Sequence, residues 1–322
     1  MQDWEKLTSM ELKIFDLGSN SNLAQCIVQN LGTRLGKVQI SRFPDGEIFV
    51  EFQENVRGCD CFIIQSMRPH ASDQILTIAL AADTLKRASA GRVTAVLPYM
   101  AYMRQDRKLK PRVPISFKLV ANILTASGVD RILTMDLHKG QLAGFFDIPV
   151  DNLLPHPVVI PLLKTIVKEQ PFVVVSPDTG GVERARVVLD ALDLPGELAV
   201  VYKQRDRSGL VSSMGIVGSP QGKIAIIIDD IVDTCSTLVQ ASKLLAESGA
   251  TAVYAFATHG VLSDIALENL KVWTPTKLMV TNTIKIPEPF LNFVEIIDVS
   301  RLFSEAIKRI HTNESVSELF KW

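Results

Sequence analysis

The stretch IAIIIDDIVDTCST, residues 224–237, contains the features that decide the fold of this chain. Its first five residues are apolar and mostly β-branched, which is typical of a strand buried on both faces of a parallel sheet. Asp229 and Asp230 follow, and a bend of small hydroxyl residues then leads into an amphipathic helical pattern from Leu238. We therefore expect a βα unit with polar residues at the carboxyl end of a strand, where open α/β sheets bind ligands.

The residues after this strand are chemically suited to a sugar phosphate. Backbone N–H groups at a helix start, together with the hydroxyls of the bend, can hold a phosphate. The carboxylates of Asp229 and Asp230 suit a vicinal diol or a metal ion. Helix capping by Asp233 or Thr237 would explain one residue, but it gives no reason for two adjacent like charges.

Strand-length apolar runs recur along the chain and alternate with amphipathic helical patterns. The runs lie at 61–64, 93–97, 131–135, 172–175, 224–228, 252–257 and 277–280. Such alternation predicts βαβ units, and hence an α/β fold whose sheets are mainly parallel and flanked by helices.

The length of 322 residues favours two domains at about 150 residues each. Ser127-Gly128 and Ser248-Gly249 each precede a strand that ends at a histidine, His138 and His259. This spacing indicates two αβ halves built alike, and chance similarity between common βα units explains it equally well. We place the domain boundary at 155/156, near the proline-bearing stretch 154–161.

Composition argues against several classes of function. Lys and Arg number 34 and Asp and Glu 35, a net charge of −1, so we expect no nucleic acid or membrane partner. The four cysteines form no CxxC motif, and we expect Cys59 and Cys61 on opposite faces of a strand, so neither a zinc site nor a disulfide framework is indicated. With no secretion signal or membrane span in the pattern, we expect a cytoplasmic location.

Several motifs, taken in order, carry a resemblance. Asp-Asp-x-x-Asp-Thr-x-x-Thr after a buried strand resembles the phosphoribosyl diphosphate loop of type I phosphoribosyltransferase folds. The other motifs are RFPDGE at 42–47, RQDRK at 104–108, PIS at 114–116, MDLH at 135–138, GFFDIPVDN at 144–152, SPDxGG at 176–181 and THG at 258–260. Together they are similar to the class I ribose-phosphate pyrophosphokinase family, also called phosphoribosyl pyrophosphate synthetase, over nearly the whole chain.

The resemblance implies two similar phosphoribosyltransferase-like domains, 1–155 and 156–302, with residues 303–322 packing back on the first. It implies transfer of the diphosphoryl group of ATP to the 1-hydroxyl of ribose 5-phosphate, giving phosphoribosyl diphosphate and AMP for nucleotide biosynthesis. No GxxxxGK[ST] motif offers an alternative nucleotide grip. The family also implies a homo-oligomer built from dimers, a hexamer.

The resemblance also assigns site residues. Those for ATP are Phe43, Asp45, Gly46 and Glu47 from one subunit and Arg104 and Gln105 from its neighbour. Those for ribose 5-phosphate are Arg205, Asp229, Asp230, Asp233, Thr234, Cys235, Ser236 and Thr237. The implied Mg²⁺ ligands are His138 and Asp178, and the implied catalytic cations are Lys203 and Arg205, in a loop that we expect after a strand at 198–202.

One departure and several alternatives accompany the resemblance. Ser236 stands where the family's loop usually has Gly, and it would either strain the loop or add a hydroxyl donor. Residues 314–320, with Ser89, are similar to the family's allosteric segment for phosphate and ADP, although helix capping by Ser315 or Ser317 explains them equally well. A non-catalytic associated subunit and a phosphoribosyltransferase are the alternative functions.

Overall fold

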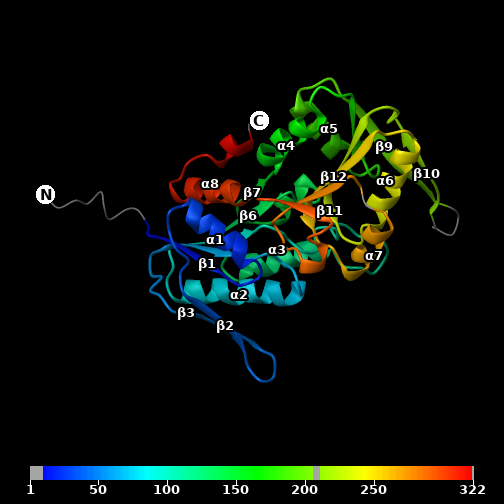
Figure 1. Ribbon diagram of the computed structural model, residues 1–322. Coiled ribbons are helices and arrows are strands. Elements are labelled where there is room, and N and C mark those ends of the chain that lie inside the picture. Colours follow the sequence, from blue (N-terminus) through cyan, green and yellow to red (C-terminus); the bar gives the residue numbers. More distant parts are fainter. Residues whose placement is uncertain (1–9, 206–210, 274, 321–322) are drawn as a thin grey trace. The chain divides into compact units, whose positions relative to one another are not determined.

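The computed structural model describes residues 10–205, 211–273 and 275–320, which form two compact units (Figure 1). Within the described residues, the first unit runs to Leu154 and also takes in Thr283–Lys285 and the chain from Ser300 onward. The second unit comprises Pro155–Asn282 and Ile286–Val299. No helix in these described ranges is both long enough and apolar enough to span a bilayer.

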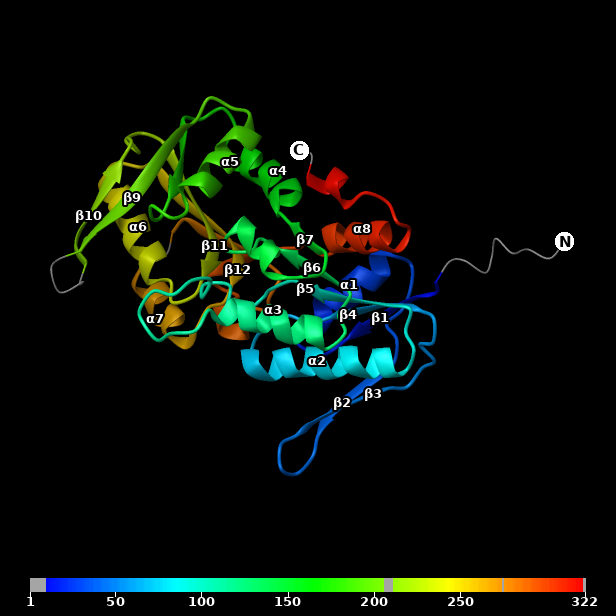
Figure 2. The ribbon, with the colours of Figure 1, turned by 180° about the vertical axis from the view of Figure 1, so that it is seen from behind.

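The first unit is built on a sheet of five parallel strands in the order β1-β4-β5-β6-β7. The strands are β1 (Leu12–Asp16), β4 (Asp60–Ile64), β5 (Arg92–Leu97), β6 (Arg131–Met135) and β7 (Val150–Leu153). Its helices are α1 (Ser21–Asn30), α2 (Ala71–Arg87), α3 (Ser116–Ala126) and α8 (Ser300–His311), with 3-10 turns η2 (Gly140–Phe145) and η4 (Val316–Phe320). Helices α1 and α8 pack together on one face of the sheet, and α2 and α3 lie on the other (Figure 2).

A β-hairpin is inserted between α1 and β4. Its strands β2 (Val38–Arg42) and β3 (Ile48–Phe52) pair antiparallel and form a separate two-stranded sheet. Strand β3 packs against α2, and the turn between the strands extends away from the rest of the unit (Figure 1).

The second unit is built on a seven-stranded sheet, as far as the chain is described, in the order β10-β9-β8-β11-β12-β13-β14. Only β10 runs antiparallel. The strands are β8 (Phe172–Ser176), β9 (Glu197–Arg205), β10 (Val211–Val217), β11 (Ile224–Val232), β12 (Ala252–Gly260), β13 (Lys277–Thr281) and β14 (Val294–Ile297). The helices are α4 (His156–Val167), α5 (Val182–Leu192), α6 (Ser236–Glu247) and α7 (Asp264–Val272), with the 3-10 turn η3 (Glu288–Phe290).

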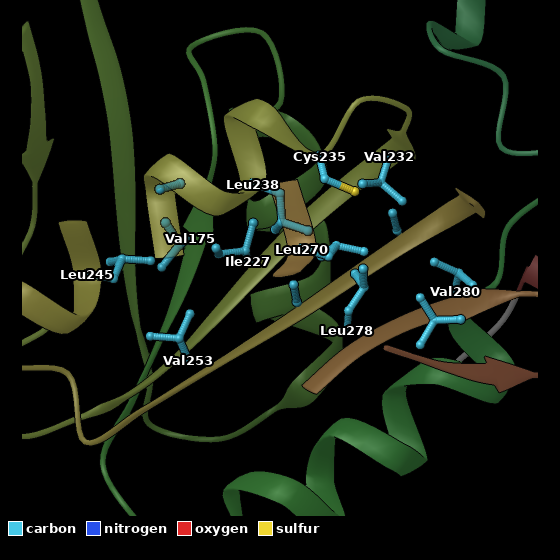
Figure 3. Packing of buried hydrophobic residues seen from close by; sticks show 14 of the residues in the cluster. Val175, Ile227, Val232, Cys235, Leu238, Leu245, Val253, Leu270, Leu278 and Val280 are labelled. Carbon is cyan, nitrogen blue, oxygen red and sulfur yellow. The ribbon is translucent and has the colours of Figure 1, made fainter. Parts of the chain in front are cut away.

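Strand β11 shows why the isoleucine run folds as a buried strand. Side chains alternate between the two faces of a strand, so an apolar run serves both faces. Ile226 and Ile228 enter the core beneath α4 and α5, whereas Ile227 enters the core beneath α6 and α7. Figure 3 shows Ile227 packed with Leu238 and Leu270 in the second of these cores.

The two units share one topology, which confirms the prediction of two similar halves. Strands β1-β4-β5-β6-β7 correspond in order to β8-β11-β12-β13-β14, and in each unit a hairpin follows the helix that comes after the first strand. The Ser-Gly…His similarity that suggested this duplication does not map onto it. It relates β6 to β12, whereas β12 corresponds to β5, so that match reflects two common βα units.

The last helix of each half packs in the other unit. Helix α4 follows β7 in the chain, but it packs against α5 in the second unit. Helix α8 follows β14, but it packs against α1 in the first unit. Because α1 and α5 are equivalent helices, the two halves exchange equivalent elements.

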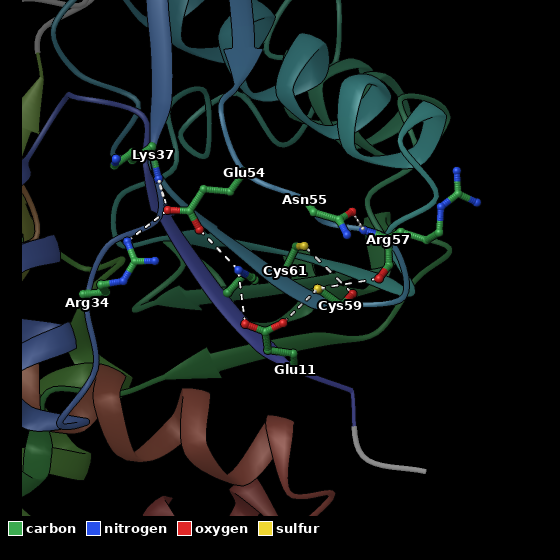
Figure 4. A network of polar contacts seen from close by, with 9 residues as sticks. Glu11, Arg34, Lys37, Glu54, Asn55, Arg57, Cys59 and Cys61 are labelled. Atoms are coloured by element: carbon green, nitrogen blue, oxygen red, sulfur yellow. Dashed lines mark hydrogen bonds and ion pairs between the residues drawn. The ribbon is translucent and has the colours of Figure 1, made fainter. Parts of the chain in front are cut away.

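The seven predicted apolar strands and the strand expected at 198–202, which is part of β9, are all present, and several others were not predicted. Strands β1, β2, β3, β7, β10 and β14 lacked a long apolar run, and β2 and β3 are largely solvent-facing. The expectation for Cys59 and Cys61 was wrong, because residues two apart share a face of an extended chain. Their thiols belong to one contact network, with the Cys61 Sγ 3.9 Å from the Cys59 carbonyl oxygen (Figure 4).

A buried ion pair between strands β4 and β5 also binds the end of helix α8. The Asp60 side chain is 1% exposed and accepts from Arg92 Nε at 2.8 Å and from Arg92 Nη2 at 2.5 Å. His311 Nδ1 lies 2.8 Å from the same carboxylate, and Arg92 also donates to the Ile310 carbonyl at the end of α8. The last turn of α8 therefore depends on one carboxylate at the start of β4.

We expect Asp60→Ala to lower the free energy of unfolding by about 3 kcal/mol, because it leaves the partly buried Arg92 guanidinium without its counter-ion. Urea denaturation measures the loss, and hydrogen exchange should show faster exchange in the last turn of α8. The matched control is Asp83→Ala, which removes the exposed ion pair with Arg87 and should change stability by less than about 0.5 kcal/mol. Equal effects of the two substitutions would contradict this account of α8.

Candidate phosphate-binding site

Strand β11 continues beyond its apolar run, so both aspartates lie within the strand and not after it. Its pairing with β8 ends at Ile227, whereas its pairing with β12 continues to Val232. Helices α5 and α6, which follow β8 and β11, belong to cores on opposite faces of the sheet. The carboxyl ends of β8 and β11 therefore form the topological switch point of this unit, the usual binding position in such sheets.

The two carboxylates at this point are electrostatically coupled. Asp230 is buried and pairs with Arg184 of α5, with Nη1 to Oδ1 at 3.2 Å. Asp229 Oδ1 accepts from the backbone N–H of Asp230 at 2.9 Å. Burial, followed by the negative charge of Asp230, raises the pKa of Asp229 well above 3.8. Asp229 is thus held in a position that favours a hydrogen-bonding or cationic partner.

The N-cap position of α6 lies at the end of the bend. Cys235 occupies the N-cap position at φ 60°, and its thiol packs in the core beside Val232 (Figure 3). Burial, and then the charge of Asp233, raises the pKa of this thiol to about 12. The N-cap position thus falls on neither Asp233 nor Thr237, and the buried, protonated thiol leaves Cys235 only its backbone to offer a ligand.

Ser236 is the first residue of α6, and the left-handed conformation falls on Cys235 before it. The serine therefore causes no positive-φ strain, which leaves an added hydroxyl as its effect. Its backbone N–H lies 3.4 Å from the Thr234 Oγ1, and its Oγ accepts from Asn269 at 3.0 Å.

Asp178 lies in the loop between β8 and α5. Its Oδ1 accepts from the backbone N–H groups of Gly180 at 2.8 Å and Gly181 at 3.0 Å. A Cβ at Gly181 would come within 2.9 Å of the Ser176 Oγ, so the tight loop requires glycine there. The loop holds an exposed carboxylate in a defined orientation.

His138 follows β6 in the first unit and is partly exposed. The turn before it includes Asp136 at φ 44°, whose N–H donates to the Leu153 carbonyl. The Asn152 Oδ1 accepts from the Leu137 N–H at 3.0 Å. Strand β7 therefore fixes the backbone on which His138 is carried.

The residues assigned to ATP lie in two places in the first unit. Phe43, Asp45, Gly46 and Glu47 form the turn of the β2–β3 hairpin, where Phe43 is 51% exposed. Gly46 takes φ 96°, and Arg42 donates to its carbonyl at 2.8 Å. Gln105 precedes α3 and accepts from the Ser116 hydroxyl at 2.6 Å, while Arg104 beside it is exposed.

The base of this hairpin is fixed by one carboxylate (Figure 4). Glu54 accepts from Lys13 Nζ at 3.2 Å, from Arg34 Nη1 at 3.0 Å and from the Lys37 N–H at 3.1 Å. These contacts link strand β1 to both ends of the hairpin. The exposed turn therefore has a well-anchored support.

Lys203 and Arg205 lie in strand β9, paired opposite Met214 and Val211 of β10, so the predicted loop does not begin after Tyr202. The side chains of Lys203 and Arg205, and residues 206–210, lie outside the described part of the molecule.

Sequence reasoning missed three residues that shape these sites: Arg184, Asn269 and Asn152. Asn152 lies in the 144–152 motif but was given no role of its own, and Arg184 and Asn269 lie in none of the motifs. Each acts through contacts with a segment that is distant in the sequence.

The described residues contain no group of three or more His, Cys, Asp or Glu side chains able to hold a metal ion. Mg²⁺ is usually bound through one or two carboxylates together with waters and substrate phosphates. The oriented, exposed carboxylate of Asp178 fits such a role.

Comparisons with known proteins agree with this geometry. Residues 12–128 match the family model described as the N-terminal domain of ribose phosphate pyrophosphokinase, and residues 198–321 match the phosphoribosyl synthetase-associated domain. The chain is 44% identical to ribose-phosphate pyrophosphokinase of Fusobacterium nucleatum, covering 96% of this chain and 98% of that protein. The corresponding enzyme of Bacillus subtilis is 45% identical, with 96% and 97% covered.

A solved structure agrees as well. The crystal structure of phosphoribosylpyrophosphate synthetase from Mycobacterium smegmatis matches with a TM-score of 0.89 and 37% identity, over 94% of this chain and 99% of that one. The molecule is thus an α/β enzyme with two phosphoribosyltransferase-like halves. The chain belongs to the ribose-phosphate pyrophosphokinase family.

We expect Asp229→Asn to stabilise the fold at neutral pH. Asparagine keeps the acceptor for the Asp230 N–H and can donate to the Asp230 carboxylate, so it removes the repulsion between two carboxylates. Because the folded pKa of Asp229 is raised, the free energy of unfolding of the wild type falls as pH rises from 3.8 through the raised value.

The advantage of Asp229→Asn should therefore be small at about pH 3.5 and reach about 1 kcal/mol or more at about pH 8 in urea denaturation. The control is Asp233→Asn, at the next aspartate along the chain. An advantage of Asp229→Asn that is equal at both pH values would contradict the raised pKa.

Proposed function

We propose that this chain transfers the diphosphoryl group of ATP to the 1-hydroxyl of ribose 5-phosphate. The hydroxyl oxygen forms a bond to the β-phosphorus and loses its proton, while the bond from that phosphorus to the oxygen of AMP breaks. The products are phosphoribosyl diphosphate and AMP. The observation that carries the proposal is the acidic end of β11 followed by the start of α6, at the switch point of a chain in this family.

In this proposal the second unit binds ribose 5-phosphate. The Asp229 and Asp230 carboxylates accept hydrogen bonds from the sugar hydroxyls, and Arg184 limits the charge repulsion between them. The 5-phosphate lies at the start of α6, where backbone N–H groups and hydroxyls favour an anion. The phosphate-binding residues proposed are Asp233, Thr234, Cys235, Ser236 and Thr237, with Cys235 acting through its backbone.

The first unit binds ATP in this proposal. The exposed Phe43 ring can stack on adenine, and its supporting edge-on contact with Phe49, at 5.6 Å between centroids, orients it. Asp45 or Glu47 can accept from the adenine amino group beside the Gly46 turn. Arg104 and Gln105, contributed by a neighbouring subunit, would pair with the phosphates.

Mg²⁺ is the proposed cofactor, with Asp178 and His138 as its proposed ligands. When bound, it neutralises phosphate charge and orients the diphosphoryl group. The chain's own part is to hold the Asp178 carboxylate through two backbone N–H groups and the His138 loop through Asn152.

Lys203 and Arg205 are the proposed catalytic cations. Phosphoryl-type transfer depends on positioning and charge neutralisation, so cations that gather around the diphosphoryl group in the transition state are the expected machinery. Their place in β9, next to β8 at the switch point, supports this assignment.

The alternative functions are less well supported. A non-catalytic subunit would be expected to lose Asp229, Thr237 or Lys203, all of which are present. A phosphoribosyltransferase would not account for the family match of both halves.

We further propose a homo-oligomer built from dimers, a hexamer, because the ATP site needs residues from two subunits. The four cysteines are free, which supports a reducing, cytoplasmic compartment. Regulation by phosphate and ADP through residues 314–320 and Ser89 remains part of the proposal.

Incubation with ATP, Mg²⁺ and ribose 5-phosphate tests the activity, and we expect AMP and phosphoribosyl diphosphate in equal amounts. Omission of ribose 5-phosphate is the control. No AMP, with diphosphate released when phosphoribosyl diphosphate and a nucleobase are supplied, would identify a phosphoribosyltransferase instead. No product in either assay would indicate the non-catalytic subunit.

We expect Lys203→Ala to lower kcat by about a hundredfold or more while the KM for ATP changes little, because the lysine acts mainly in the transition state. Steady-state kinetics at saturating Mg²⁺ measure both constants. Lys223→Ala, at a half-buried loop lysine paired with Glu197, is the control and should leave kcat near that of the wild type. A parallel loss of ATP affinity and turnover after Lys203→Ala would place the lysine in ground-state binding.

A further inference from the structure

Asn269 contacts the bend before α6 twice through one side-chain amide. Its Nδ2 donates to the Thr234 carbonyl oxygen at 2.8 Å and to the Ser236 Oγ at 3.0 Å. A carbonyl oxygen can only accept, so the atom that faces Thr234 has to be the amide nitrogen. Both hydrogens of this amide are therefore used to hold the loop.

The contact with Ser236 determines what the serine hydroxyl can do. Because the Ser236 Oγ accepts from Asn269, its own hydrogen is left as a donor for another group. Ser236 begins α6, where the N-terminal end of the helix favours an anion. Asn269 thereby turns the one departure from the family's usual loop into a donor that suits a phosphate.

The contact with Thr234 keeps a backbone carbonyl oxygen from facing the proposed phosphate. A carbonyl oxygen that turned toward a phosphate would repel it, and a hydrogen bond from Asn269 ties this oxygen to α7. The residue before α7 also contacts the bend, because the Ser263 N–H donates to the Asp233 carbonyl at 3.2 Å. Asn269 is the side chain that extends this hold to the middle of the bend.

We infer that Asn269 is a positioning residue for the 5-phosphate of the sugar substrate, acting as a pair with Ser236. The inference rests on the proposed function and deepens it. Asn269 orients the Ser236 hydroxyl as a donor and keeps the Thr234 carbonyl away from the phosphate. Once either side chain has been removed, removal of the other should have a smaller effect on ribose 5-phosphate binding, because the two side chains share one hydrogen bond.

The test uses the full chain and five variants: Asn269→Ala, Asn269→Asp, Ser236→Gly, the double variant Ser236→Gly with Asn269→Ala, and the control Glu268→Ala on the exposed face of α7. We expect Asn269→Ala to raise the KM for ribose 5-phosphate about three- to tenfold, while kcat and the KM for ATP stay within about twofold. Asn269→Asp, of the same shape, should raise it further because a carboxylate repels both the Thr234 carbonyl and the phosphate. Glu268→Ala should match the wild type.

The double variant tests the pairing. Its KM for ribose 5-phosphate should be at least about threefold lower than the product of the two single effects predicts. Calorimetric titration with ribose 5-phosphate alone should show the same order of affinities, and urea denaturation of each variant checks that the fold is kept. If Asn269→Ala proves unstable, the measurement can be made on Asn269→Asp, which keeps the shape of the side chain.

The inference is overturned if Asn269→Ala and Asn269→Asp bind ribose 5-phosphate as the wild type does. It is also overturned if the KM for ATP rises as much as that for ribose 5-phosphate, or if the two single effects simply multiply in the double variant. A wild-type chain that forms no AMP would instead defeat the proposed function. An active wild type with indifferent Asn269 variants defeats only the role of Asn269.

Discussion

The change in β11 from apolar to acidic between Ile228 and Asp229 is the constraint on which the second unit depends. Up to Ile228 every side chain enters one of two cores, and burial in both fixes the strand in the middle of the sheet. Asp229 and Asp230 cannot be buried in these cores without partners. Asp230 therefore pairs with Arg184, while Val232 two residues later is again part of the core beneath α6, and the polar end of the sheet begins where the sequence of β11 turns acidic.

The partners of these aspartates follow from the same constraint. Strand β8 has already stopped pairing at Ile227, so the backbone of β11 is not paired with β8 at the level of Asp229. Arg184 of α5 balances the charge of the buried Asp230, and the N–H of Asp230 donates a hydrogen bond to Asp229. The bend then needs one left-handed residue, which Cys235 supplies, to start α6 on the opposite face from α5. Each of these steps places polar groups at one edge without disturbing the apolar layers.

Much of this arrangement could be predicted from the sequence, because it depends on local pattern. The β-branched runs gave the buried parallel strands, and the alternation with helices gave the fold class. The solvent-facing hairpins were harder to predict, since β2 and β3 have no apolar run that a core requires. The extent of β9 through Arg205 was also missed, because pairing with β10 continues that strand beyond its apolar run.

Residues that act through long-range contacts could not be recognised in advance. Asn269 contacts Thr234 although the two residues are 35 positions apart, and nothing in the local sequence of either predicts the contact. Asp60 at the start of β4 contacts His311 at the end of α8, although the two residues are 251 positions apart. Only the folded chain brings such pairs together, so the site's motifs were predictable and the groups that support them were not.

The exchange of α4 and α8 between the halves has a consequence for biosynthesis. A ribosome releases the strands of the first unit early, but the helix that covers α1 is encoded after all strands of the second. The nascent first unit therefore emerges with the apolar side of α1 uncovered until the end of translation. A chaperone that binds apolar helix surfaces could cover this face until α8 emerges.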